Sequence, residues 1–232
     1  MGNLPIYISI IFMLTTFLTV GLFYKATNGS KTTLLILLTW LLLHTFIALC
    51  GFYTNTDTVP PRFLLLVLPP LLFIIILFAT SKGRHYIDNL NIKTLTILHT
   101  IRIPVELVLF WLYINEMIPG LMTFEGRNFD ILSGLTAPVI FYFGFIKKRI
   151  NKNVILIWNF ICLGLLINII VNAILSAPFP FQQFAFDQPN IAILYFPFIW
   201  LPCCIVPLVL FAHLSTIRQL LTTDKNTRVN RM

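Results

Sequence analysis

The sequence predicts an all-α, polytopic transmembrane helical bundle, and two observations predict it. Of the 232 residues, 58% are hydrophobic and 10% are charged, whereas about 25% of residues are charged in an average soluble domain. The apolar residues fall into separate runs, each close to the roughly 20 residues that an α-helix needs to cross about 30 Å of hydrocarbon. These runs are apolar on every side and do not alternate in polarity, which excludes a transmembrane β-barrel.

About seven membrane spans are predicted, and they use almost the whole chain. One transmembrane domain therefore occupies residues 1–217, and a short basic cytoplasmic tail follows at 218–232. The first span lacks the leading basic residues and the small-residue cleavage site of a secretory signal, so we expect it to be retained. The predicted spans lie at roughly 4–24, 34–53, 62–80, 95–115, 131–147, 154–175 and 191–214.

The distribution of Lys and Arg predicts the orientation of the bundle. Most of the 16 basic residues follow spans one, three, five and seven and so fall on one side, whereas the opposite side has only Arg62 and Arg127. By the positive-inside rule, the N-terminus is outside and the C-terminus is cytoplasmic. We therefore expect a multi-pass protein of a cell membrane. The abundance of Ile, Phe, Asn and Lys is typical of AT-rich microbial genomes and favours a bacterial cytoplasmic membrane.

Charge and cysteine patterns exclude several classes of function. The sequence pI near 9.5 comes from short basic loops, so we expect the lipid bilayer, and not a nucleic acid, as the partner of these charges. The four cysteines and four histidines form no C-x-x-C pair and no H-x-x-x-H pair. Neither a metal site nor another cofactor is expected.

The main candidate site is a stripe of ionisable residues inside the fourth span. His99, Arg102 and Glu106 are separated by three and then four residues, which places them on one face of a helix. An unpaired charge near the bilayer centre costs about 3 kcal/mol or more, so Arg102 and Glu106 are predicted to pair. The stripe is expected to face protein or water. The opposite face is expected to contact lipid, and it carries Leu98, Val105, Leu109 and Leu112.

Two interpretations of this stripe remain open. Pro104 removes a backbone hydrogen bond to Thr100 and weakens the helix between the two charges. In the first interpretation, a structural ion pair joins the fourth span to a neighbouring helix. In the second, the stripe is a substrate-binding or proton-handling site, in which Arg102 holds an anionic group and Glu106 is its counter-ion or carries a proton.

Polar residues of other spans extend this candidate site. His44 and His213 lie in spans two and seven. Each is either part of a proton relay from His99 or a hydrogen-bonded core residue. Asn168 and Asn172 lie one turn apart in span six, where they either line a cavity or join helices by hydrogen bonds.

The outer loop before span five supplies a candidate outer gate, formed by Glu125, Arg127 and Asp130. Asp130 is also predicted to be the N-cap of span five. Glu125 and Arg127 either gate an entrance or form a solvated ion pair. Span five itself is short and carries small residues before Pro138, a pattern typical either of transporter binding sites or of close helix packing.

Span seven contains three prolines, Pro197, Pro202 and Pro207, each five residues from the next. A proline has no N–H to donate, so such breaks either permit bending or leave carbonyl oxygens free for another group.

These residues favour a carrier or binding protein for a small solute that uses the intramembrane Arg/Glu site. Catalysis is less favoured because no aspartate-rich metal motif, activated Ser or Cys, or clustered His accompanies Glu106. Two alternatives stay open. One is an intramembrane enzyme that acts on a lipid or isoprenoid. The other is a sensor or assembly subunit, which would need a membrane-protein partner because the short loops carry no output domain.

Overall fold

The computed structural model describes the backbone of residues 4–229 and side chains as far as Thr222, and this part of the chain contains helices and loops but no strand. Residues 230–232 of the predicted tail lie outside the described residues. The α-helices are α1 (Ile6–Ala26), α2 (Lys31–Leu49), α3 (Leu64–Ala79), α4 (Ser81–Asp88), α5 (Ile92–Leu98), α6 (Arg102–Ile114), α7 (Ile131–Ile140), α8 (Lys152–Leu175) and α9 (Val206–Val229).

Short 3₁₀ or π-helical segments adjoin four of these helices. A 3₁₀ turn, η2 (His99–Ile101), joins α5 to α6. A π-helical segment, η4 (Phe141–Ile146), follows α7, and another, η6 (Leu201–Ile205), leads into α9. Three further 3₁₀ turns lie between the long helices: η1 (Phe52–Thr54), η3 (Gly120–Met122) and η5 (Ala192–Leu194).

Five helices of the described chain are long and apolar enough to cross a membrane: Ile6–Ala26, Lys31–Leu49, Ile92–Ile114, Lys152–Leu175 and Leu201–Thr222. The pair α3 and α4 passes the same test together but is bent by 93°, which raises the number to six if the pair is one span. The predicted fifth span corresponds to the shorter apolar helix Ile131–Ile146. The described chain is therefore all-helical, with five or six helices long and apolar enough to span a membrane, whereas seven spans and their orientation stay predictions.

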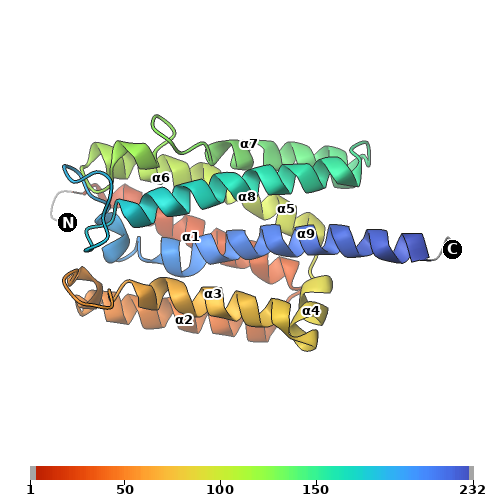
Figure 1. Ribbon diagram of the computed structural model, residues 1–232, viewed down its shortest axis with the longest axis horizontal. Helices are drawn as coiled ribbons and strands as arrows, with labels where there is room; N and C mark the ends of the chain where they lie inside the picture. Colours follow the sequence, from red (N-terminus) through yellow and green to blue (C-terminus); the bar gives the residue numbers. More distant parts are fainter. Residues whose placement is uncertain (1–3, 230–232) are drawn as a thin grey trace.

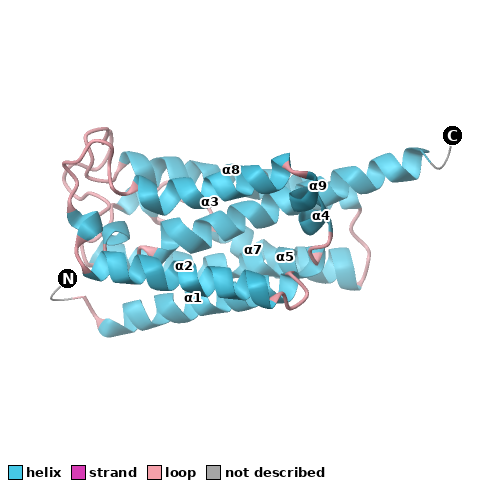
Figure 2. Ribbon diagram, turned by 90° about the horizontal axis from the view of Figure 1, so that it is seen from below, coloured by secondary structure: helices cyan, strands magenta, loops and turns pink. Residues whose placement is uncertain are grey.

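The helices run roughly parallel to one long axis (Figures 1 and 2). In Figure 1, α2 and α3 form one side of the bundle, α6, α7 and α8 form the other, and α1 and α9 lie between them. The loops that follow α1, α3 and α7 lie at the same end as the last turns of α9, so the short basic loops share one end of the bundle. Arg218, the first residue of the predicted tail, continues α9 and pairs with Asp88 of α4 at 2.9 Å.

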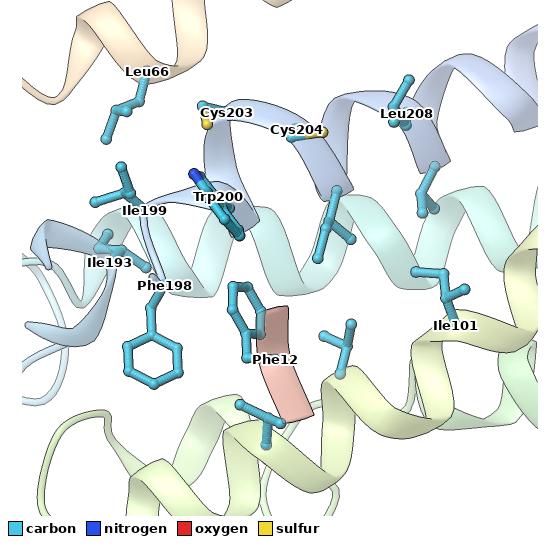
Figure 3. Packing of buried hydrophobic residues seen from close by; sticks show 14 of the residues in the cluster. Phe12, Leu66, Ile101, Ile193, Phe198, Ile199, Trp200, Cys203, Cys204 and Leu208 are labelled. Carbon is cyan, nitrogen blue, oxygen red and sulfur yellow. The ribbon is translucent and has the colours of Figure 1, made fainter. Parts of the chain in front are cut away.

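The last long helix begins ten residues later than the predicted start at 191. Residues 192–194 form η5, and the helix starts at Leu201. The prolines at 197 and 202 cannot donate the backbone hydrogen bonds that a regular helix would need across this segment. The apolar residues before the helix instead pack into the core, where Phe198 meets Phe12 of α1 with ring centroids 5.2 Å apart (Figure 3).

A carbonyl left free by Pro207 joins α9 to α2. In a regular helix the residue at 207 would donate to the carbonyl of Cys203, but proline has no N–H. The indole Nε1 of Trp40 in α2 donates to that carbonyl at 2.9 Å. A second hydrogen bond joins the same two segments: the indole of Trp200, labelled in Figure 3, donates to the hydroxyl of Thr45 in α2 at 3.0 Å.

The helix α5–η2–α6 is buried on the face that was predicted to contact lipid. Its residues Leu98, Val105, Leu109 and Leu112 are between 0% and 7% exposed, because α1 and α9 pack against this span. That prediction is wrong. An apolar helix face fits lipid tails and apolar side chains equally well, so the pattern of one helix does not distinguish them.

The small residues of α7 serve close packing against this central span. A Cβ atom added to Gly134 would lie 2.9 Å from Cγ1 and 3.0 Å from the backbone nitrogen of Ile103. Ser133 and Ala137 are also fully buried. Of the two explanations left open for the short helix, close packing is therefore the one that the contacts support.

Gly134→Ala is expected to lower the stability of the bundle, because the added methyl group has to push α7 away from α6. Overpacking of this kind costs about 1–3 kcal/mol. The measurement is the midpoint of thermal unfolding in detergent. Gly164→Ala in α8 is the matched control, since nothing lies within 4 Å of its added Cβ and Ala is the better helix former by about 1 kcal/mol. Equal midpoints for the two variants would contradict the assignment.

Candidate functional site

Arg102 lies near the middle of the central span Ile92–Ile114. At a rise of 1.5 Å per residue, its Cα is about 15 Å from either end of that helix. Arg102 and Glu106 are each 2% exposed. A buried charge at this depth requires a counter-charge and hydrogen bonds.

The counter-charge of Arg102 is Asp130, and not Glu106 as predicted. Arg102 Nη1 donates to Asp130 Oδ1 at 2.6 Å and also reaches the carbonyl of Cys162 in α8 at 3.4 Å. The prediction failed because it assigned Asp130 to an exposed outer loop. The loop after α6 folds back into the bundle, and Asp130 enters it at the start of α7, with 5% of the residue exposed.

Asp130 occupies the N-cap position of α7, as predicted, but its carboxylate makes no cap hydrogen bond. It accepts instead from Arg102 and, at 3.4 Å, from the hydroxyl of Ser133. Both contacts favour the charged form of this buried carboxyl.

His213 of α9 is the second partner of Arg102, and its contacts define its tautomer. Arg102 Nη2 lies 2.9 Å from His213 Nε2, and a guanidinium can only donate, so Nε2 accepts. His213 Nδ1 then carries the hydrogen and donates to Oδ1 of Asn159 at 2.9 Å. The side-chain Nδ2 of Asn159 in turn donates to the backbone carbonyl of Ile155 in α8. His213 is thus a neutral imidazole fixed at both nitrogens.

Glu106 is held by Asn128, a residue that the sequence did not single out. Asn128 Nδ2 donates to Glu106 Oε2 at 2.6 Å and to the carbonyl of Met122 at 3.0 Å. Its Oδ1 accepts from the backbone nitrogen of Asp130 at 3.0 Å. Asn128 is fully buried and links the carboxylate of Glu106 to the backbone of Asp130. We call the six residues the Arg102 cluster: Arg102, Glu106, Asn128, Asp130, Asn159 and His213.

His99 lies against this cluster without a hydrogen bond. Its ring stacks on that of His213 with centroids 3.8 Å apart, and the edge of Trp158 approaches it at 5.6 Å. Among the described residues, neither ring nitrogen of His99 has a hydrogen-bond partner, and neither has Nε of Arg102. A buried polar atom without a hydrogen bond is costly, so these nitrogens are available to bond a water molecule or a bound solute.

A cavity of about 110 Å³ adjoins the cluster and is lined by Arg102, Glu106 and Asp130. This volume accommodates a few water molecules, each of which takes about 30 Å³ in the liquid, or one small solute. The remaining walls are mostly apolar and include Leu166, Ile169, Ile205 and Val209. No group of three or more His, Cys, Asp or Glu within the described part of the chain has a geometry suited to a metal ion.

The other predicted residues lie apart from the cluster's hydrogen bonds. His44 in α2 bonds through Nδ1 to the hydroxyl of Tyr53 at 2.6 Å. Asn168 donates to the backbone carbonyl of Arg127 at 2.8 Å, and Asn172 donates to Asn168 in turn.

The three residues predicted as an outer gate differ in burial and pairing, and the gate itself stays a prediction. Glu125 and Arg127 are exposed, whereas Asp130 is buried. Over the residues that the structure describes, no salt bridge joins Glu125 to Arg127, and Asp130 pairs with Arg102.

Asp130→Asn is expected to lower the free energy of unfolding by about 3–5 kcal/mol, because it removes the carboxylate that forms a salt bridge with the buried guanidinium of Arg102. The double variant Arg102→Met with Asp130→Leu removes both charges and should recover most of that loss. Arg127→Gln, on an exposed side chain, is the control and should change stability by less than about 0.5 kcal/mol. Unfolding midpoints in detergent test the series. A double variant no more stable than Asp130→Asn would contradict the pairing.

Comparisons with known proteins give one family. The sequence profile of a domain of unknown function (DUF8737) matches residues 60–221, which is well over half of the chain and includes every residue of the Arg102 cluster. No curated protein and no solved structure matches the chain. The chain therefore belongs to the DUF8737 family.

Proposed function

We propose that this protein is a multi-pass carrier or binding protein for a small solute, and that Glu106 exchanges a proton or another cation as part of its cycle. The proposal places it in a cell membrane, with the basic loops on the cytoplasmic side and a bacterial cytoplasmic membrane favoured by composition. The five or six helices of membrane-crossing length support the membrane location.

The charge balance of the Arg102 cluster carries this proposal. Arg102 contributes one positive charge, His213 is neutral, and Asp130 and Glu106 are two carboxyl groups. With both carboxyls ionised the cluster bears one uncompensated negative charge in a buried, mid-membrane position, which is costly. The cluster becomes neutral when Glu106 holds a proton or when a cation enters the adjoining cavity.

The proposal gives different roles to the two carboxyls. Asp130 is already paired with Arg102 at 2.6 Å and bonded to Ser133, so it is the fixed counter-ion. Glu106 has Asn128 as its neutral partner and lines the cavity, so it is the exchangeable group. The sequence favoured Arg102 as the group that holds an anionic solute. In this proposal it does not do so, because its guanidinium is already bonded to Asp130. Its unpartnered Nε remains available to donate to a small polar solute.

His99 and His213 have supporting roles in the same proposal. The stacked pair lies beside Arg102, and His213 fixes the position of the guanidinium. His44, Asn168 and Asn172 bond elsewhere, so we do not assign them a part in solute binding.

Glu106→Gln tests the proposal, since Gln has nearly the same shape but carries no exchangeable charge. We expect wild-type expression to change the cellular or external level of at least one small solute relative to an empty vector. Glu106→Gln should abolish that change at an unchanged protein level. Glu125→Gln, the same substitution at an exposed glutamate, should retain it. The measurement is a mass-spectrometric survey of cell extracts and medium.

The stability of Glu106→Gln separates this proposal from a purely structural role. Removing an uncompensated buried charge should leave the unfolding midpoint unchanged or higher, as is common for residues kept for function. A lower midpoint together with an unchanged solute profile would refute the proposal. If the survey shows an altered lipid instead of a soluble solute, the alternative of an intramembrane enzyme acting on lipids would replace the carrier; the apolar walls of the cavity are compatible with such a substrate.

A further inference from the structure

A second and larger hollow lies on the other side of α9 from the Arg102 cluster. It is a groove of about 1020 Å³ between α2, α3, α4 and the beginning of α9. Along α2 it extends from Ser30 to Leu43, which corresponds to about 20 Å of helix. Cys203, Cys204 and Leu208, labelled in Figure 3, contribute to its α9 wall.

The groove has apolar walls and one polar end. The polar end lies where α2 and α4 begin, at the end of the bundle that carries the basic loops (Figure 1). Thr33 bonds there to Ser30 at 3.0 Å and to the hydroxyl of Tyr86 at 3.2 Å. Lys82 is exposed and lines this end. No Asp or Glu is among the described residues that line the groove, so its only formal charge is positive.

The helix that forms one wall of the groove makes few contacts with the rest of the protein. Only 11% of the apolar window of α2 is buried, the lowest share among the five long helices. Its buried residues are Leu41, His44 and Ala48, all in its second half. The described chain therefore leaves the first half of α2, beside the groove, largely uncovered.

We propose that this groove binds an anionic phospholipid from the leaflet next to the basic loops. Its acyl chains lie between α2 and α3, and its phosphate lies beside Lys82. The length of the groove exceeds the roughly 15 Å of one leaflet, half of the hydrocarbon core, so a lipid chain can lie along it. Lys82 and the N-terminal ends of α2 and α4 all favour negative charge. This site is independent of the function proposed for the Arg102 cluster.

Native mass spectrometry of the purified full chain tests the head-group end. The delipidated protein is titrated with phosphatidylglycerol or with phosphatidylcholine of the same acyl chains. We expect the wild-type protein to retain phosphatidylglycerol in preference to phosphatidylcholine. Lys82→Ala should reduce this preference about fivefold, the equivalent of about 1 kcal/mol for one basic residue near an anionic lipid. Lys93→Ala, an exposed lysine at the same end of the bundle that does not line the groove, should leave it unchanged.

A second pair of variants tests the acyl-chain end. Thr39 is exposed and lines the groove, so Thr39→Trp fills it and should abolish retention of both lipids. Leu42→Trp adds an indole to a side chain that is 70% exposed on the same helix but outside the groove, and should retain them. Because Lys82 is exposed, its variant keeps the test valid even if Thr39→Trp fails to fold.

Three results would overturn the proposal. The first is equal lipid preference in Lys82→Ala and Lys93→Ala. The second is undiminished lipid retention in a folded Thr39→Trp variant. The third is a lipid-free dimer that Thr39→Trp dissociates and Leu42→Trp does not, which would assign the groove to a second copy of the chain.

Discussion

The ion pair between Arg102 and Asp130 is the interaction on which the arrangement of this bundle depends. A guanidinium in the middle of a helix long and apolar enough to cross a membrane is too costly to leave without a counter-charge, and three neighbouring helices each supply one of its partners. The start of α7 provides the carboxylate of Asp130, α8 provides the carbonyl of Cys162, and α9 provides the neutral imidazole of His213. Three elements that pack around the central span therefore do so in a register that this one side chain requires.

The backbone around Arg102 is irregular, and α7 packs closely against it. The 2.6 Å ion pair joins Arg102 to the start of α7, and Gly134 permits the close approach of α7 to this span. The change from α-helix to 3₁₀ turn at His99–Ile101 occurs just before Pro104, where one backbone hydrogen bond is already missing. The loop residues Asn128 and Asp130 are buried beside this stretch.

The sequence predicted the helical class and the central charges because both depend on local composition. It placed Arg102 and Glu106 in one buried span, since hydropathy and helical spacing are properties of a single segment. The partner of Arg102 was assigned incorrectly because Asp130 follows a polar loop, and no local pattern indicates that this loop folds inward. Asn128 was missed for the same reason. The wrong lipid-facing assignment of Val105 arose because apolar side chains and lipid tails impose the same composition on a helix.

The irregular helices also determine where the bundle can rearrange at the lowest cost. Opening a regular helix requires breaking backbone hydrogen bonds, whereas Pro138 and Pro207 have already removed them beside the cluster. The π-helical segments η4 and η6 follow or precede these prolines. Pro207 lines both the 110 Å³ cavity and the 1020 Å³ groove, so one weakened stretch of α9 separates the charged cluster from the groove. In the cycle that we propose, a change of charge at Glu106 would act on the part of the bundle whose backbone has already lost a hydrogen bond.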